Sequence, residues 1–563
     1  MSADALAVLV PVAGGLASPL VPERARRWFL LAIAVATFAA LARLEPGARL
    51  ALELFGVTLV PVRVDRLGLL FGYVFGIAAF LNLIFAWHVR RGVEQPAAMV
   101  YAGAAIGAVL AGDLLTLFVY WEITAIASVL LVWARGTPRA WRSGMRYVLV
   151  QLASGMLLAA GAAVRYAQTG SLDFDRIGLD GAGGALILLA FGVKCAFPLL
   201  HNWLQDAYPE STPTGTVVLS AFTTKLGIYA LARGFPGTEE LVYIGAVMTA
   251  FPIFYAVIEN DLRRVLAYSV NNQLGFMVVG IGLGTELGLN GAVAHAFADI
   301  LFKALLFMSM GAVLFRTGTI KGSELGGLYK SMPWTAGLCV VGAASISAFP
   351  LFSAFVTKSM ILVSAAEQGH PWVWLVLLFA SAGVFHHAGI KIPYFAFFAH
   401  DSGIRCREAP RHMLFAMGIA AALCIGIGVF PEALYRLLPY PVEYAPYTAS
   451  HVLAQLQLLV CSALAFAVLM RTGIYPPELR SVNLDFDWVY RRAAPALVHA
   501  ASTGWAFASA RTGAASRALL QRIGRTVERW CGADGVLART WSTSAMTLWV
   551  AALLAAYLLA RYL

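Results

Sequence analysis

The chain has 563 residues, of which 60% are hydrophobic and only 13% are charged, and its formal net charge is +11. Soluble proteins carry about 25% charged residues, so this composition excludes a soluble domain and indicates an integral membrane protein. Arginines beside membrane segments explain the positive charge better than nucleic-acid binding does. The six cysteines form no CxxC motif, which excludes an iron–sulfur or zinc signature, and we expect neither a cofactor nor a metal.

Apolar segments long enough to span a bilayer follow one another along the chain. The first lacks a basic region before it and a cleavage site after it, so we expect a retained helix rather than a signal peptide. The segments predict an all-α polytopic membrane protein with about 14–16 transmembrane helices. They lie at 3–21, 28–43, 66–87, 97–112, 114–133, 145–164, 184–203, 214–233, 240–258, 264–284, 288–314, 333–365, 372–398, 413–431, 452–470 and 545–562.

Basic loops fall in alternate gaps between these segments, and the intervening gaps are acidic or neutral. Basic loops stay on the cytoplasmic side of a membrane. This pattern predicts a multi-pass protein of a bacterial inner membrane with its N-terminus outside. The basic gaps contain residues 24–27, 90–91, 135–146, 263–264, 316–330 and 405–411.

Glu122 lies in the middle of the otherwise uncharged segment 114–133. An ionised carboxylate at the centre of a bilayer costs roughly 3 kcal/mol or more. A charge placed there is a functional candidate, because structure alone does not require it.

Lysine is rare in this chain, since most of its 41 basic residues are arginine. An arginine keeps its proton in a protein, whereas a lysine can lose its proton when burial lowers its pKa. A proton relay therefore needs lysine rather than arginine. Five of the seven lysines lie inside apolar segments, where arginine is nearly absent: Lys194, Lys225, Lys303, Lys358 and Lys391.

Prolines lie near a buried lysine in two segments, Pro198 after Lys194 and Pro350 before Lys358. Proline breaks a helix, and helices broken inside a membrane mark ion sites in transporters. The two segments run in opposite directions, which indicates an inverted repeat. We expect N-terminal helices at 1–96, a first repeat at 97–235, a second repeat at 236–431, and C-terminal helices at 432–563.

His295, Asp299 and Lys303 are spaced four residues apart and share one helix face. Asp299 and Lys303 could form a static ion pair. With His295 beside them, a titratable chain that exchanges protons through water is the preferred interpretation.

Other candidates are weaker. Lys391 lies near a cytoplasmic end and could extend to the membrane surface. His201 and Asp206 lie at the cytoplasmic mouth of segment 184–203. The adjacent His386 and His387 point about 100° apart on a helix, so they cannot bind one metal ion together, and we interpret them as a polar lining or satisfied core histidines.

The C-terminal stretch at about 485–535 contains no spanning segment. Leu520, Ile523, Val527 and Trp530 share one helical face, and arginines occupy another. This pattern predicts an amphipathic lateral helix along a membrane or a partner, although an ordinary solvated helix is the alternative.

Four motifs in a fixed order resemble the antiporter-like membrane subunits found in Mrp-type cation/proton antiporters, respiratory complex I and membrane-bound hydrogenases. The resemblance covers roughly residues 70–430. The chain departs from the family pattern at Asp299, Gln205 and Tyr208. The motifs read WE at 121–122, KCAFPLLHNWLQDAYPESTPTGTVVLS from 194, DLRRVLAYSVNNQLG from 261 and HAFADILFKALLF from 295.

The resemblance implies a role for each buried charge. It implies that Glu122 pairs with Lys194 at a proton-entry half-channel. Lys225, His295 and Lys303 would form the bridge, and Lys358 would be the terminal group at the exit. A terminal lysine is similar to the D-type subunits of Mrp antiporters and to some complex I subunits.

We therefore expect a proton-translocating subunit of a multisubunit membrane complex rather than an enzyme. The favoured assembly is an Mrp-type Na⁺/H⁺ antiporter with this chain as its D subunit. The alternative is a pumping subunit of a complex I-like, hydrogenase or inorganic-carbon-uptake complex. An intramembrane haem enzyme lacks opposed histidine ligands, and a structural scaffold does not need five intramembrane lysines.

Overall fold

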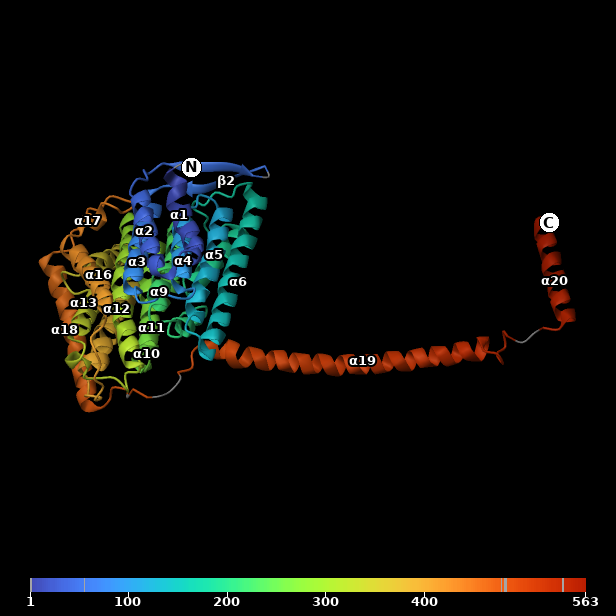
Figure 1. The fold of residues 1–563 in the computed structure, drawn as a ribbon. Coiled ribbons are helices and arrows are strands. Elements are labelled where there is room, and N and C mark those ends of the chain that lie inside the picture. The colour runs from blue at the N-terminus through green and yellow to red at the C-terminus, as the bar shows by residue number, and fades with distance from the viewer. Residues whose placement is uncertain (1–2, 55, 477, 480–482, 539–540, 563) are drawn as a thin grey trace. The chain divides into compact units, whose positions relative to one another are not determined.

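The computed structural model describes residues 3–54, 56–476, 478–479, 483–538 and 541–562. The chain divides into two compact units, Met1–Asn483 and Leu484–Leu563. The first unit is a helical bundle with a β-hairpin at one end (Figure 1). The second unit contains two helices.

All sixteen predicted segments are helical, and eleven helices among the described residues are long and apolar enough to cross a membrane. The polytopic all-helical prediction is confirmed on this point. The helices of the first unit are α1 (Ala3–Ala17), α2 (Glu23–Leu41), α3 (Arg66–Phe85), α4 (Glu94–Leu110), α5 (Leu114–Trp133), α6 (Pro138–Thr169), α7 (Gly181–Lys194), α8 (Asn202–Ala207), α9 (Gly215–Gly234), α10 (Glu240–Ile258), α11 (Leu262–Leu283), α12 (Glu286–Thr317), α13 (Pro333–Ile346), α14 (Ser353–Glu367), α15 (Pro371–Val384), α16 (Arg411–Val429), α17 (Glu432–Tyr435) and α18 (Ala449–Thr472).

A two-stranded antiparallel hairpin was not anticipated from the sequence. Strands β1 (Arg49–Leu54) and β2 (Val57–Arg63) pair between α2 and α3. The signal was present, because apolar and polar residues alternate through RLALEL and Gly56 adopts a φ of 77° at the turn. The Val60 N–H donates to Oδ2 of Asp113 at 2.7 Å, which fixes the hairpin to the start of α5.

Two stretches of the bundle repeat one another. Asp113 and Asp261, 148 positions apart, each cap a helix with the side chain and each form an isolated β-bridge to a residue 60 positions later. Helices α6 and α12, offset by the same 148 positions, both have 32 residues, a threonine N-cap and a left-handed glycine at the C-terminus. Five segments, α5, α6, α7–α8, α9 and α10, separate the start of α5 from the start of α11, and four of them are long and apolar enough to span a membrane. An odd number of segments reverses the chain direction, which supports the predicted inverted repeat.

Each repeat contains a broken helix at an Ala-Phe-Pro-Leu sequence. Helix α7 ends at Lys194 and the chain resumes as α8, while α13 ends at Ile346 and resumes as α14. Ala196 and Leu199 in the first break have φ of 60° and 70°, and Ala348 and Leu351 in the second have φ of 58° and 74°. The two breaks therefore share one backbone conformation and expose helix ends inside the bundle, as the prolines predicted.

The basic loops lie at one end of the bundle, and the acidic or neutral loops lie at the other end. Arg135 and Arg263 contact the loop at 209–212 at one end. At the other end Asp113 contacts the β-hairpin and forms a bridge with Asp173. The alternation seen in the sequence is thus present in the fold, and the assignment of one end to the cytoplasm stays a prediction.

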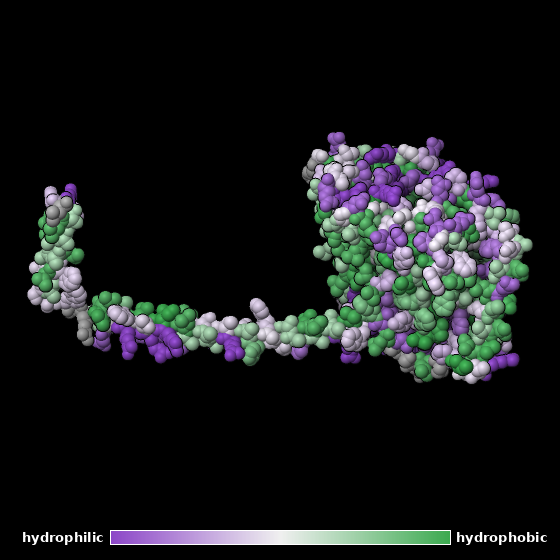
Figure 2. All heavy atoms as spheres, turned by 180° about the vertical axis from the view of Figure 1, so that it is seen from behind, coloured by the Kyte–Doolittle hydropathy of each residue, from purple (hydrophilic) through white to green (hydrophobic). Residues whose placement is uncertain are grey.

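The core of the first unit consists of α9, α11 and α12, which are almost entirely buried by the surrounding helices. On the face shown in Figure 2, hydrophilic residues gather at one end of the bundle and hydrophobic residues cover much of its side. Charges carried by the three core helices lie far from water, so each must be accounted for by a partner or by function.

The second unit contains α19 (Ala494–Cys531) and α20 (Thr543–Tyr562). Helix α19 has 38 residues, and its hydrophobic and hydrophilic residues lie on opposite sides (Figure 2). The prediction of an amphipathic helix is confirmed. Helix α20 is apolar and long enough to span a membrane.

Candidate functional site

Glu122 lies in a space that exists because the neighbouring helix has a glycine at the facing position. A Cβ atom on Gly155 of α6 would overlap Oε1 of Glu122, so only glycine leaves room for this carboxylate. Oε1 is buried and has no hydrogen-bond partner among the described residues. The carboxylate is therefore positioned by shape and remains able to accept a proton.

Lys194 ends α7 at the first helix break and is completely buried. Its Nζ atom donates to the carbonyl of Trp121 at 3.1 Å and to Oγ1 of Thr124 at 2.8 Å. The ammonium also lies 4.0 Å from the centre of the Trp121 ring, a cation–π distance. Lys194 thus contacts the turn of α5 that carries Glu122.

Glu122 and Lys194 lie within electrostatic range of each other, as the predicted pairing requires, but they make no direct contact. Among the described residues no ion pair within 4.0 Å joins them, because Lys194 turns to Trp121 and Thr124 while Glu122 lies toward Gly155. Glu122 and the ammonium of Lys194 lie beside the same turn of α5, but each makes its own contacts. A proton passing between them would need a water or a side-chain movement.

Lys225 of α9 and Asp299 of α12 form an ion pair across the core. The distance from Nζ to Oδ2 is 2.5 Å, and both side chains are completely buried. Lys225 also donates to the carbonyl of Ser220 at 3.2 Å. Asp299 is therefore engaged with a lysine from another helix and not locked to Lys303, the alternative that the spacing on α12 allowed.

Lys303 and His295 lie one turn on either side of Asp299 on α12, and both are completely buried. The Nζ atom of Lys303 has no hydrogen-bond partner among the described residues. His295 contacts Oε1 of Gln273 at 2.9 Å through Nε2 and Oγ1 of Thr357 at 3.0 Å through Nδ1. The histidine thus connects α12 to α11 and α14, next to Lys358.

Lys358 of α14 lies past the second helix break with 1% of its surface exposed. Its Nζ atom is 3.4 Å from the carbonyl of Ile346 and 4.6 Å from the centre of the Phe276 ring. Both Lys194 and Lys358 therefore lie beside a helix break and against an aromatic ring. Such weak contacts hold a lysine in place without an anionic partner.

Lys391 is completely buried, so the prediction that it extends to the membrane surface is wrong. Its Nζ atom donates to the carbonyls of Ala256, Val257 and Glu259 at 3.1, 2.6 and 2.7 Å. It also lies 2.9 Å from Oε1 of Glu478. Lys391 therefore caps the C-terminal end of α10, where a positive charge is favoured.

His201 and Asp206 contribute to an end of the bundle rather than to the buried row. Arg146 donates to both carboxylate oxygens of Asp206, at 2.6 and 3.0 Å. The His201 ring lies edge-on against Phe251 at 4.6 Å. His201 precedes the short α8 and Asp206 lies within it, and both anchor the chain after the first break.

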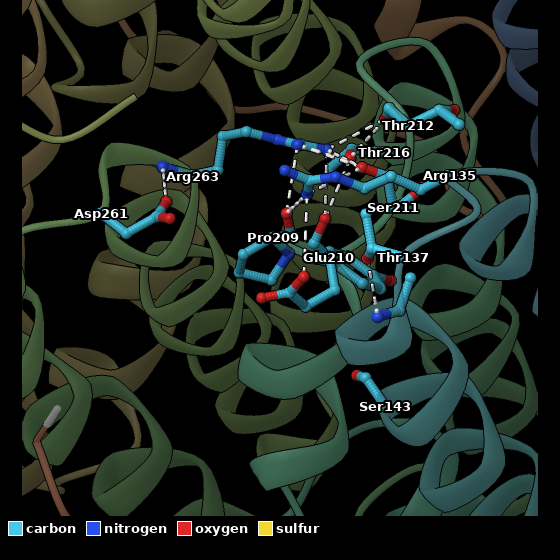
Figure 3. Close-up of polar contacts among 12 residues, drawn as sticks. Arg135, Thr137, Ser143, Pro209, Glu210, Ser211, Thr212, Thr216, Asp261 and Arg263 are labelled. Atoms are coloured by element: carbon cyan, nitrogen blue, oxygen red, sulfur yellow. Dashed lines mark hydrogen bonds and ion pairs between the residues drawn. The ribbon is translucent and has the colours of Figure 1, made fainter. Parts of the chain in front are cut away.

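Two arginines hold the loop that follows α8. Arg263, which is completely buried, donates to the carbonyls of Ser211 at 3.1 Å and Thr212 at 3.0 Å. Arg135 donates to the carbonyl of Pro209 at 2.6 Å, and both side chains reach toward this loop in Figure 3. The two arginines therefore fix the connection between the broken helix and α9, which carries Lys225.

Several residues that position these charges were missed in the sequence analysis. Gln273, Thr357, Thr124 and Gly155 hold or make room for the titratable groups. Gln273 lies within an apolar helix, and a polar amide there is a usable signal. Gly155 and the threonines gave no such signal, because small residues are common in membrane helices.

Helices α5, α7, α9, α12 and α14 carry a row of two carboxylates and four lysines. Asp299 and the lysines are buried, and Glu122 is partly buried; the lysines are Lys194, Lys225, Lys303 and Lys358. Such a row can take up and release protons if its contacts rearrange. Among the described residues no three His, Cys, Asp or Glu side chains gather closely enough to bind a metal ion.

Comparison with known proteins relates this region to a protein family. Residues 111–385 match the model of the NADH:quinone oxidoreductase/Mrp antiporter transmembrane family. The chain is 32% identical over 278 residues to the D subunit of the Na⁺/H⁺ antiporter of Alkalihalophilus pseudofirmus, covering 46% of this chain and 56% of the relative. It is 29% identical to the A/B subunit of a probable K⁺/H⁺ antiporter of Rhizobium meliloti, covering 75% and 46%. The chain spans about half the length of these two relatives.

A third relative is matched over more of its length. The chain is 29% identical to NAD(P)H-quinone oxidoreductase chain 4 of a Synechococcus species, covering 76% of this chain and 89% of the relative. Among solved structures, a chain of the archaeal membrane-bound sulfane sulfur reductase is similar with a TM-score of 0.72 and 22% identity, covering 99% of this chain and all of that one. A chain of the Mrp complex from a Dietzia species is similar with a TM-score of 0.68 and 21% identity, covering 83% and 99%.

Proposed function

The chain belongs to the antiporter-like membrane subunits, and from this membership we propose that it moves protons across a bacterial inner membrane as one subunit of a larger complex. We also propose that the N-terminus lies on the outer side of this membrane. Partner subunits would supply the driving force for proton movement, because the similar solved structures are assemblies of several chains.

The observation that supports the proposal is the buried row of lysines. Lys194, Lys303 and Lys358 have no ion pair among the described residues although all three are buried. Burying an unpaired charge is strongly unfavourable, so a static structural role explains these residues poorly. Loss and uptake of a proton explains them, since a neutral amine is far cheaper to bury than an ammonium.

In the proposed mechanism each proton moves by changing the contacts of its neighbour. A proton that reaches Glu122 removes the negative charge that favours the ammonium form of Lys194, and Lys194 passes its proton toward Lys225. Lys225 and Lys303 then compete for the carboxylate of Asp299. Lys303 and Asp299 lie on the same face of α12. His295 connects this centre to Lys358, which releases the proton at the far side.

For the finer assignment we propose the D subunit of an Mrp-type Na⁺/H⁺ antiporter. The identity of 32% to such a chain and the terminal Lys358 support it. A second candidate is a pumping subunit of a redox-driven complex. The likeness over 99% of this chain to a subunit of an archaeal respiratory complex favours the second candidate, because that match includes the C-terminal unit.

The test is proton movement in everted membrane vesicles that contain the native complex, followed with a pH-sensitive dye. We expect Glu122→Gln and Lys194→Met to abolish it, and wild-type movement in both variants would refute the proposal. Glu240→Gln and Lys321→Met are matched controls at exposed positions and should leave it unchanged. Addition of Na⁺ separates the two assemblies, since Na⁺ dissipates a pH gradient only through an antiporter.

A further inference from the structure

The helix that follows α14 changes its winding where it passes the buried row. Helix α15 continues from Phe385 to Lys391 as a π-helix, a form that is rare and often lies at functional sites. His387 lies in this stretch, is completely buried, and has the backbone of Gly383 as its hydrogen-bond partner but no side-chain partner on either ring nitrogen among the described residues.

His387 stands between charges of the row and charges near the bundle end. It lies within electrostatic range of Lys303, His386 and Lys391. Lys303 is the lysine whose Nζ atom has no hydrogen-bond partner in the described part of the chain. A buried imidazole with one ring nitrogen free, near a buried amine that has no hydrogen-bond partner, can exchange a proton with it.

His386 and Tyr475 extend this line toward the surface. The rings of His386 and Tyr475 stack at 5.5 Å with an angle of 11°, and Phe466 lies edge-on to His386 at 5.1 Å. Tyr475 belongs to the segment after α18, and its hydroxyl lies within electrostatic range of Glu478.

Glu478 ends the line. Its Oε1 atom pairs with Lys391 at 2.9 Å, and a Cβ atom on Gly322 would lie 3.5 Å from its Oε2 atom. Burial raises the pKa of the Glu478 carboxyl, with Lys391 acting in the opposite direction and Glu259 adding to the increase. The side chain is 6% exposed, and both of its carboxylate oxygens are buried.

We propose that His387, His386 and Glu478 form a branch of the proton relay that leaves the row at Lys303, with Glu478 as its terminal proton-exchanging group. Lys391 is a positioning residue, because the three carbonyls of α10 and the ion pair hold it between the branch and the bundle end. The proposal rests on the proposed proton movement and adds a route to it.

Each step of the branch transfers one proton and leaves no charge behind. The ammonium of Lys303 gives a proton to a ring nitrogen of neutral His387, so an N–H bond breaks on the lysine and one forms on the imidazole. The two rings point in different directions, so a bridging water carries the proton from the imidazolium to His386, and bridging waters carry it on to the carboxylate of Glu478 and then to bulk water. Lys303 regains a proton from its neighbours in the row, and the same steps run in reverse for uptake.

The test uses everted vesicles with the native complex, as above, and adds the apparent melting temperature of the purified complex. His387→Leu replaces a buried imidazole whose one hydrogen-bond partner is the backbone of Gly383 by an apolar group, so the melting temperature should change little. Proton movement should fall at least about tenfold, because general acid–base groups contribute at least this much. Ser381→Ala, which removes another buried and unpartnered polar atom from α15, is the matched control and should keep wild-type movement.

Glu478 supplies a second, independent arm. Glu478→Gln should lower proton movement to a similar degree, and Glu478→Asp should restore it with a pH profile shifted to lower pH. Wild-type movement in His387→Leu, or equal loss in Glu478→Asp and Glu478→Gln, would overturn the branch. If Glu122→Gln abolishes movement while His387→Leu does not, only the branch is wrong; if both variants move protons normally, the proposed function itself is wrong.

Discussion

The Nζ atom of Lys225 lies 2.5 Å from Oδ2 of Asp299, and both groups are completely buried between α9 and α12. This contact joins the two repeats, since α9 closes the first and α12 belongs to the second. It also leaves Lys303, one turn away on α12, without a hydrogen-bond partner among the described residues. Asp299 thus lies near both Lys225 and Lys303 but can form a close ion pair with only one of them.

Removing one charge of the Lys225–Asp299 pair should destabilise the protein more than removing both charges. Lys225→Met or Asp299→Asn leaves one buried charge without its partner, which costs about 3–5 kcal/mol. The double variant removes both charges and should recover most of the apparent melting temperature while proton movement stays absent. Thermal unfolding of the purified complex measures the first effect and vesicle assays the second; additive losses in the double variant would show that the two groups do not interact.

Gly155→Ala should displace Glu122, because the new Cβ atom would overlap Oε1. A displacement of about 1 Å at a reacting group can lower a rate about a hundredfold, and we expect proton movement to fall by about tenfold to a hundredfold. Gly418→Ala is the control, since nothing lies within 4 Å of a Cβ atom there.

Glu122→Asp in the Gly155→Ala background shortens the acidic side chain and should restore part of the movement. Equal movement in Gly155→Ala and the wild type would mean that the position of Glu122 does not matter.

Lys358→Arg distinguishes a relay from a static charge. Arginine keeps the positive charge but cannot release its proton at any physiological pH. We expect proton movement to fall at least about a hundredfold in Lys358→Arg and in Lys358→Met. Co-purification of the complex monitors assembly. A scaffold would show the reverse, with normal movement in Lys358→Arg and poor assembly in Lys358→Met.

Acidic pH should loosen the loop between α15 and α16. Arg405, Lys330 and the N–H of Gly403 donate to Asp401 and hold the pKa of this exposed carboxyl well below its usual value of about 4. A lowered pKa stabilises the folded state above the unfolded value, and the effect is lost as the pH falls below about 4. Asp401→Asn should therefore increase proteolysis of this loop at about pH 7 and make no difference once the wild-type carboxyl is protonated at strongly acidic pH.

The helices and the broken segments could be predicted because bilayer length, apolar runs and proline act locally. The partners of the charges could not. Asp299 and Lys303 are spaced for a pair on one helix, yet Asp299 pairs with Lys225 because tertiary packing brings α9 closer than the helix geometry brings Lys303. Lys391 looked able to reach the surface, but the segment after α18 covers it, and nothing in the sequence near Lys391 indicates that segment.

The two helix breaks have the same backbone conformation but differ in the position of the nearby charged residues. With the 152-position offset that relates Ala196 to Ala348, Ile346 takes the place of Lys194, and Asp206 takes the place of Lys358. The lysine therefore precedes the break in one repeat and follows it in the other. A pair of inverted repeats with identical charges would look the same from both faces of the membrane and could not distinguish them. The exchanged lysines give the molecule a polarity, so that in the proposed function an otherwise two-fold scaffold takes up protons at one face and releases them at the other.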